Sequence, residues 1–334
     1  MTFSVRFHGL SDVGKERDTN QDHFLLARLK KELVVEQTSL PDHEQSQHEG
    51  DLEGHLLLVA DGMGGYAGGE LASRIAIDSA ALYVLNTVPW FYRQKDDCID
   101  EFQAALKESL EFAQKQLAAE ARNRPFERDM GTTLTMAYIV GKQLFVVHIG
   151  DTRCYLSRGD RLHQITHDHT VAQKLVEEGM MSPETAETSP MSHVLWNAIG
   201  AGDRSSHNPD VYKAAITAGD FVLVCSDGLT KHVTDEQLLQ VISGGDSLEE
   251  KCATLVDMAN EAGGTDNITV ALAAIEGDPG TLPELRHETW HGKAIPVEKK
   301  STLQFADPAS TEIQARETLP LGEEPRKTPP PEVK

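Results

Sequence analysis

The chain of 334 residues has few cysteines, a deficit of basic residues and no long hydrophobic run. Its four cysteines form no CxxC pair, which argues against a zinc site or a disulfide framework and favours buried free thiols. Basic residues number 31 against 53 acidic ones, and the formal net charge of −22 argues against binding to the phosphate backbone of nucleic acids. No apolar stretch reaches the roughly 18 residues of a membrane-spanning helix, and the N-terminus lacks the pattern of a signal peptide. We therefore expect a cytoplasmic protein with no nucleic-acid or membrane partner.

Two segments differ in composition from the rest of the chain. Residues 277–334 contain nine of the 15 prolines and little hydrophobic periodicity, which predicts a disordered tail, either a docking arm for an unknown partner or a passive extension. Residues 36–53 contain six acidic and no basic residues, and the simplest interpretation is a solvated loop between two strands. Metal capture by the histidines near this loop is the alternative. What remains is one domain over residues 1–276, which we expect to be monomeric.

Residues 1–276 alternate apolar strands with amphipathic helices. Strands are predicted at 56–60, 132–140, 143–149, 221–225 and 268–274, and helices at 70–85, at 99–122 and after Ser247. A Gly141-Lys142 turn makes a hairpin of the second and third strands, and Asp246 or Ser247 is expected to cap the last helix. Hairpins with helices grouped between them favour an α+β fold, in which an antiparallel or mixed sheet is layered with helices.

Four aspartates lie at strand ends beside glycine: Asp61, Asp151, Asp227 and Asp266. Any one of them alone is most simply explained as a turn. Together they can converge on one edge of a sheet, where their carboxylates repel one another unless cations lie between them. Oxygen ligands without histidine or cysteine suit Mg²⁺ or Mn²⁺, and two such ions can activate a water for attack on phosphorus. The pattern indicates a metal site of that kind.

The N-terminal segment 11–24 contains an arginine and an aspartate five positions apart, Arg17 and Asp22. A guanidinium can hold a phosphate through two parallel hydrogen bonds, which an ammonium does less well. Arg17 is therefore a candidate phosphate ligand, although the segment on its own would be interpreted as a polar loop with a surface arginine.

Six short motifs occur in an order that resembles one known family. They are Arg17…Asn20-Gln21-Asp22, Asp61-Gly62-Met63-Gly64-Gly65, Gly131-Thr132-Thr133, Gly150-Asp151-Thr152-Arg153, Ser226-Asp227-Gly228 and Thr265-Asp266-Asn267-Ile268-Thr269. In this order they resemble the metal-dependent protein phosphatases, the PPM or type 2C serine/threonine phosphatases, and they cover most of residues 1–276. Met63, where eukaryotic members have a histidine, and Leu229-Thr230 after Asp227-Gly228 point to the bacterial type. Gln21 departs from a glutamate common at that position.

The resemblance implies a four-layer αββα sandwich of two mostly antiparallel sheets, with the metal site at one edge. The implied cofactors are two Mn²⁺ or Mg²⁺ ions. By the same resemblance, Asp61 would bridge the two metals and the Gly62 carbonyl would ligate one of them. Asp227 and Asp266 would complete the other.

Further residues match the family's site. Asp151, together with Asp227, matches the residues that hold a third, weaker metal in bacterial members. Arg17 matches the phosphate-binding arginine, and Asp22 matches the acidic residue that organises metal-bound water. The thioether of Met63 cannot deliver a proton, so protonation of the leaving group would fall to metal-bound water or to another group.

The segment Thr166-His167-Asp168-His169 could be taken for the metal-binding pair of an HD-type hydrolase. In the family that the chain resembles, a similar Asp-His pair opens the flap, which here would span about residues 169–208 and lie beside the active site. We therefore expect structural roles for His167 and His169, and a role in substrate choice for the flap.

The function predicted from these motifs is hydrolysis of phosphoserine or phosphothreonine in proteins that a serine/threonine kinase has phosphorylated. Two alternatives stay open at this point. A catalytically silent regulator of the same fold would bind partners through its tail, but it is expected to lose metal carboxylates, whereas Asp61, Asp227 and Asp266 are all present. A phosphatase of a small phosphorylated molecule would carry the same motifs, because they do not specify what the phosphate is attached to.

Overall fold

The computed structural model describes residues 4–30, 32–34, 47–49, 53–64, 68–87, 99–123, 130–200 and 208–277. The tail beyond residue 277 and most of the acidic loop lie outside the described residues, so the expectations for them stay predictions. Within the loop, the short strand β4 (Gln47–Glu49) pairs with β3 (Glu32–Val34) in a two-stranded antiparallel ladder. None of the described helices is long and apolar enough to cross a membrane.

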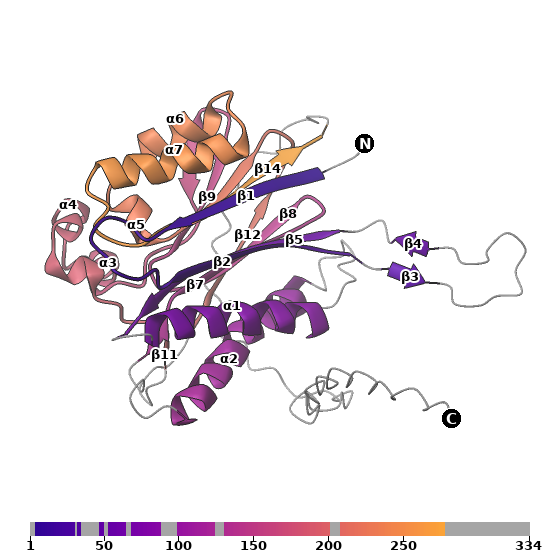
Figure 1. The fold of residues 1–334 in the computed structure, drawn as a ribbon, viewed down its shortest axis with the longest axis horizontal. Helices are drawn as coiled ribbons and strands as arrows, with labels where there is room; N and C mark the ends of the chain where they lie inside the picture. Colours follow the sequence, from indigo (N-terminus) through magenta and orange to yellow (C-terminus); the bar gives the residue numbers. More distant parts are fainter. Residues whose placement is uncertain are drawn as a thin grey trace, which may run out of the picture. The chain divides into compact units, whose positions relative to one another are not determined.

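Two sheets form the centre of the molecule (Figure 1). The first has the order β1 (Ser4–Asp12), β14 (Ile268–Glu276), β13 (Phe221–Cys225), β9 (Arg153–Arg158) and β10 (Arg161–Gln164). The second has the order β11 (Ile199–Gly200), β6 (Gly131–Thr132), β5 (Gly54–Met63), β7 (Leu134–Val140), β8 (Gln143–Ile149) and β12 (Asp210–Ala215), with β2 (Asp22–Leu29) also paired to β5. Neighbouring strands in the described part of both sheets pair antiparallel.

Alternation along the central strands explains how the layers stack. In β5, Leu56, Leu58 and Ala60 belong to one hydrophobic cluster, whereas Leu57 and Val59 belong to another. A strand buried on both faces needs a continuous apolar run rather than an alternating one. Strands β13 and β14 divide in the same way, between the cluster that lies between the sheets and a third cluster. The apolar runs in the sequence therefore identify strands in the middle of the sandwich.

Helices cover the outer face of each sheet. The first cluster joins α1 (Gly68–Thr87) and α2 (Ile99–Asn123) to β5, β7 and β8. The third cluster joins α6 (Asp235–Ser243) and α7 (Leu248–Glu261) to β9, β13 and β14. Figure 1 shows the resulting order of helix, sheet, sheet and helix. The αββα sandwich is therefore confirmed.

The flap connects β10 to β12 and is described up to residue 200 and from residue 208. It contains α3 (Val171–Glu177), α4 (Pro183–Glu187) and a single 3₁₀ turn (Pro190–His193). Thr170 caps α3 by accepting a hydrogen bond from the Gln173 N–H. These elements are short, and β11 joins the second sheet by pairing with β6.

The structure also tests the helix cap and the free thiols that were predicted from the sequence. Ser247, one of the two residues expected to cap the last helix, caps α7 in a reciprocal capping box with Glu250. Cys154, Cys225 and Cys252 are buried free thiols, as predicted, and Cys98 lies outside the described residues.

Candidate active site

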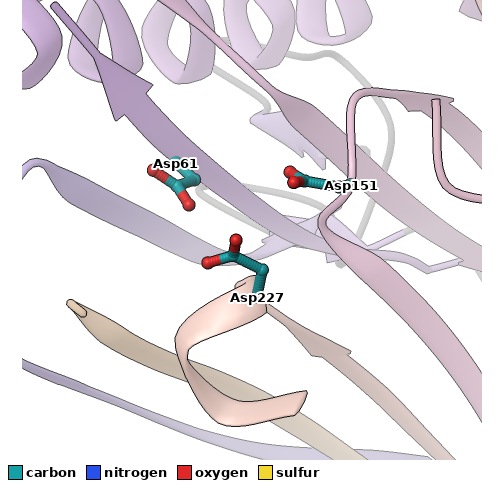
Figure 2. A group of neighbouring side chains, drawn as sticks. All are labelled: Asp61, Asp151 and Asp227. Atoms are coloured by element: carbon teal, nitrogen blue, oxygen red, sulfur yellow. The ribbon is translucent and has the colours of Figure 1, made fainter. Parts of the chain in front are cut away.

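Three of the predicted carboxylates converge at one edge of the sandwich, those of Asp61, Asp151 and Asp227 (Figure 2). One oxygen from each lies within 4.8 Å of the other two. Asp61 lies two residues before the end of strand β5, Asp151 follows β8, and Asp227 opens the short helix α5 (Asp227–Thr230) after β13. Strand ends from both sheets thus meet here, and the structure brings these three residues together.

Asp266 lies beside this cluster and is held by two basic side chains. Arg17 contacts both of its oxygens: Nη2 donates to Oδ2 at 3.0 Å, and Nε lies 2.9 Å from Oδ1 in an ion pair. Lys231 Nζ lies 2.9 Å from Asp266 Oδ2 and 2.6 Å from Asp227 Oδ2. Burial alone would raise the pKa of Asp266, but the hydrogen bonds from Lys231 and Arg17 outweigh it and lower that pKa. This side of the site is therefore neutralised by the chain itself.

Lys231 was not among the residues predicted from the sequence. It follows Asp227 by four positions, a spacing that places both side chains on one side of a helical turn. That spacing was the available signal, but the contact with Asp266 depends on the packing of α5 beside the start of β14.

The other carboxylates of the site are not neutralised in this way. Burial raises the pKa of Asp61 well above its usual range, and the carboxylates of Asp22, Asp227 and Asp151 raise it further. Burial raises the pKa of Asp151 as well, with Asp227 as the next cause. Carboxyl groups this close together favour a proton or a cation between them.

Asp22 lies in β2 directly opposite Asp61 in β5. Its side chain is only 4% exposed, and neither oxygen has a hydrogen-bond partner among the described residues. Burial raises the pKa of Asp22 to about 7, although the nearby hydroxyls of Ser226 and Thr269, which do not reach hydrogen-bond geometry, favour its charged form. A buried carboxylate without partners is costly unless a ligand or water satisfies it.

Backbone contacts fix the end of β5. The Asp61 N–H donates to Thr133 Oγ1 at 3.0 Å, and the Asp61 carbonyl accepts from the Thr133 N–H at 2.9 Å and from Thr132 Oγ1 at 2.8 Å. Gly62 has no room for a side chain, because a Cβ there would lie 2.1 Å from the Gly69 carbonyl oxygen. The glycine and the two threonines therefore hold Asp61 where its carboxylate reaches the cluster.

Asn267 ties the N-terminal segment to the start of β14. Its side-chain amide donates to the carbonyls of Val13 at 2.9 Å and Thr19 at 3.0 Å, and its Oδ1 accepts from the Gln21 N–H at 2.8 Å. These three bonds hold the loop that carries Arg17 against Asp266. The motif around Asn267 thereby explains how residues almost 250 positions apart come to share one site.

His169 lies at the base of the flap, and both of its ring nitrogens have protein partners. Nε2 lies 3.1 Å from Asp210 Oδ2, and Nδ1 is 3.2 Å from the Gly150 nitrogen and 3.1 Å from Asn197 Nδ2. Because two N–H groups donate to Nδ1, the proton of the neutral ring lies on Nε2 and is donated to Asp210. This arrangement agrees with the structural role expected for the residue.

The neighbouring residues of the same segment are engaged elsewhere. Asp168 accepts two hydrogen bonds from Arg153, from Nε at 2.9 Å and from Nη2 at 2.7 Å. The His167 ring is about half exposed and lies 3.6 Å from Glu177. Among the described residues, the segment therefore contributes nothing to the acidic cluster, and an HD-type metal site does not form.

A cleft of about 1070 Å³ opens over the carboxylates. Arg17 and Met63 line it together with flap residues 193–198. Met63 and Trp196 are 37% and 44% exposed there. A second cleft, of about 940 Å³, shares Asp151, Asp227 and Lys231 with the first. The flap therefore lies beside the site, as expected from the sequence.

Comparison with known proteins places the chain in a family. The sequence model of the family "Protein phosphatase 2C" matches residues 36–273. Protein phosphatase PhpP of Streptococcus pneumoniae is 31% identical over 267 residues, which cover 80% of this chain and 96% of PhpP. The structure of the serine/threonine phosphatase PstP/Ppp of Mycobacterium tuberculosis has a TM-score of 0.65 and 32% identity, with coverage of 82% of this chain and 99% of that one. The catalytic domain of PstP in complex with two manganese ions has a TM-score of 0.63 and 31% identity, with coverage of 83% and 100%. The chain therefore belongs to the protein phosphatase 2C family of serine/threonine protein phosphatases.

Proposed function

We propose that this chain hydrolyses phosphoserine and phosphothreonine in proteins that a serine/threonine kinase has phosphorylated, with two divalent metal ions, Mn²⁺ or Mg²⁺, in the site. The observation that carries the proposal is the convergence of Asp61, Asp151 and Asp227 at the sandwich edge. The relatives support it, because they are named as protein phosphatases and the catalytic domain of PstP binds two manganese ions.

The chemistry of the residues fits divalent metal ions. The candidate ligands offer oxygen atoms only, which Mg²⁺ and Mn²⁺ prefer. Both oxygens of Asp22 and Oδ1 of Asp227 are buried without hydrogen-bond partners in the described part of the chain, so they are left for water or an ion to satisfy. The proposed ligands are Asp61, the Gly62 carbonyl, Asp227 and Asp266, with Asp151 joining Asp227 at a third, weaker position.

The residues of the chain would bind and orient the reactants. Ions bound at the carboxylates would supply an activated water and neutralise charge on the phosphoryl oxygens. Asp22, buried opposite Asp61, would accept a hydrogen bond from that water and hold its orientation. Arg17 is 53% exposed at the mouth of the cleft, and its two donors, which now bind Asp266, have the spacing that suits two phosphoryl oxygens.

The cleft also favours a substrate larger than a small phosphoester. Trp196 on the flap and Met63 at the end of β5 both expose apolar surface along its walls. Such surface suits the side chains that flank a phosphorylated residue in a polypeptide, because burying it gains free energy from the hydrophobic effect. A small phosphorylated molecule would leave it unused.

Phosphate release from a phosphothreonine peptide in the presence of Mn²⁺ tests the proposal. Asp227→Asn should lower kcat by about 10³-fold or more, because several kcal/mol of transition-state stabilisation are lost. Asp160→Asn makes the same chemical change at the exposed turn between β9 and β10 and should leave kcat unchanged. Activity that survives Asp227→Asn, or that a chelator does not abolish, would contradict the proposal.

The same assay separates protein from small-molecule substrates. We expect kcat/KM to be at least tenfold higher for the phosphothreonine peptide than for free phosphothreonine, because the peptide reaches the apolar surface of the cleft. Replacing Trp196 with alanine should reduce this preference by raising KM for the peptide alone. Equal kcat/KM values for the two substrates would instead favour a small phosphorylated molecule.

A further inference from the structure

Lys231 places a positive charge inside the carboxylate site. Its Nζ lies 2.6 Å from Asp227 Oδ2 and 2.9 Å from Asp266 Oδ2, so one ammonium joins carboxylates from two separate elements, α5 and the start of β14. The side chain is 25% exposed, and the Lys231 N–H donates to the Asp227 carbonyl at 2.8 Å. Both its main chain and its side chain are therefore anchored to the site.

The two basic side chains of the site have different positions. Arg17 contacts Asp266 from the cleft side, and its side chain is 53% exposed. In the described part of the chain, the ion pairs of Asp227 are made by Lys231. The ammonium therefore lies between the two aspartates that are proposed to share one metal ion and contacts one oxygen of each, Asp227 Oδ2 and Asp266 Oδ2.

A divalent ion bound to Asp227 and Asp266 would lie close to the Lys231 ammonium, whichever oxygen of each carboxylate it used. Oxygen ligands lie about 2.1 Å from Mg²⁺, so an ammonium that contacts the same two carboxylates would be close enough to such an ion to repel it strongly. Lys231 also lines the second cleft of about 940 Å³, so its flexible side chain has space to move away from the carboxylates.

We propose that Lys231 is an internal cation that takes the place of one divalent ion in the metal-free protein and is displaced when that ion binds. This inference rests on the proposed function, since it concerns the metal ions of the same site. The residue stabilises the metal-free carboxylates and raises the metal concentration at which the site fills. Lys231 is thus a positioning residue for the metal rather than a group that touches the substrate.

Mn²⁺ titration of the metal-free, full-length protein tests the inference, with isothermal titration calorimetry and the electron paramagnetic resonance signal of free Mn²⁺ as readouts. Lys231→Gln and Lys231→Met should each bind the weaker of the two Mn²⁺ ions at least tenfold more tightly than the wild type. Lys142→Gln makes the same charge change at the turn between β7 and β8, at the end of β7 away from Asp61, and should bind as the wild type does. Affinities within twofold of the wild type for both Lys231 variants would overturn the inference.

Thermal denaturation gives a second readout that a general loss of stability would not reproduce. Without metal, Lys231→Gln should melt below the wild type, because Asp227 and Asp266 lose their internal cation. With saturating Mn²⁺ the difference should vanish. An equal decrease in Tm with and without Mn²⁺ would show a merely structural role and would overturn the inference.

These measurements do not depend on catalysis. A protein that binds Mn²⁺ and responds to Lys231→Gln as expected, but releases no phosphate from the phosphothreonine peptide, would contradict the proposed function and support the inference. If neither the wild type nor the variants bind Mn²⁺, both are wrong.

Discussion

Two buried polar regions adjoin the end of β8, and their polar atoms are satisfied to very different degrees. The carboxylate cluster comprises Asp22, Asp61, Asp151 and Asp227, and three of its buried oxygen atoms lack hydrogen-bond partners among the described residues. The histidine network comprises His148, His169, Thr135, Thr152 and Asp210. In this network both ring nitrogens of each histidine have partners. Among the described side chains that bond to the network, Asn197 alone has a buried oxygen without a hydrogen-bond partner.

The contrast separates residues that serve the fold from residues that serve a ligand. Polar groups buried in a protein are normally hydrogen-bonded, because an unpartnered group costs about 1–3 kcal/mol. The histidine network obeys this rule, as Thr135 Oγ1 lies 2.8 Å from His148 Nδ1 and Nε2 of the same ring lies 3.0 Å from the His167 carbonyl. The carboxylate cluster breaks the rule, and burial raises the pKa values of Asp61 and Asp151 within it. We therefore expect substitutions in the two regions to affect different properties.

The largest effect is expected for Asp61→Asn, which should separate activity from stability. Its kcat on the phosphothreonine peptide should fall by about 10³-fold or more, through the loss of several kcal/mol of metal-dependent stabilisation. The metal-free variant should nevertheless be more stable than the metal-free wild type at pH 7.5, because a neutral amide relieves the repulsion that raises the pKa of Asp61. Urea denaturation in the presence of a chelator measures the second quantity. A variant that is less stable than the wild type and fully active would show that Asp61 serves the fold rather than a ligand.

A smaller effect, of the opposite kind, is expected for His169→Ala. The substitution removes the partner of the Gly150 N–H, one of the two side-chain donors to Asp210 and a buried ring, which should lower the free energy of unfolding by about 3 kcal/mol. Turnover well below the melting temperature should change far less than in Asp61→Asn. His167→Ala, which removes a half-exposed ring two positions away, is the matched control and should lose little stability. If His169→Ala has wild-type stability, the network does not serve the fold.

The sequence predicts the central part of the fold better than its margins. The ends of the predicted strands and helices, such as 56–60 and 70–85, fall within three residues of β5 and α1, because strands buried on both faces and long amphipathic helices have strong apolar patterns. Strands β1, β2, β10 and β12 were not predicted. They lie at sheet edges and are mostly half-buried, so their apolar signal is weak. Strand β9, which is buried between β13 and β10, was missed as well, because its short run begins and ends with an arginine.

The candidate site follows the same pattern. The aspartates at strand ends could be selected from the sequence, because an aspartate beside glycine after an apolar run is a local signal. The contacts of Lys231 and Asn267 could not be predicted, because they join the start of β14 to helix α5 and to the N-terminal loop. Their roles depend on how distant segments pack, and no local pattern determines that packing.

The smallest expected effect is the dependence of stability on pH. The two regions differ in it, because their buried groups change the free energy of unfolding in opposite directions as the pH falls. Burial lowers the pKa of His148 to about 3, against about 6.5 in an unfolded chain. Below pH 6.5 the unfolded state therefore gains a proton that the folded state does not bind, so the stability that neutral His148 contributes is complete above pH 6.5 and is lost as the pH falls toward 3.

His148→Gln removes this titration and keeps a side chain that can form hydrogen bonds. From pH 8 to pH 5 the wild type should therefore lose about 2 kcal/mol of stability relative to the variant, as measured by urea denaturation of the metal-free proteins. The raised pKa values of Asp61 and Asp151 act in the other direction, since their contribution is lost as the pH rises, but they are common to both proteins and cancel in the difference. A difference in stability that is independent of pH would mean that folding leaves the pKa of His148 unchanged, and the histidine network would then not exclude a proton from the folded state.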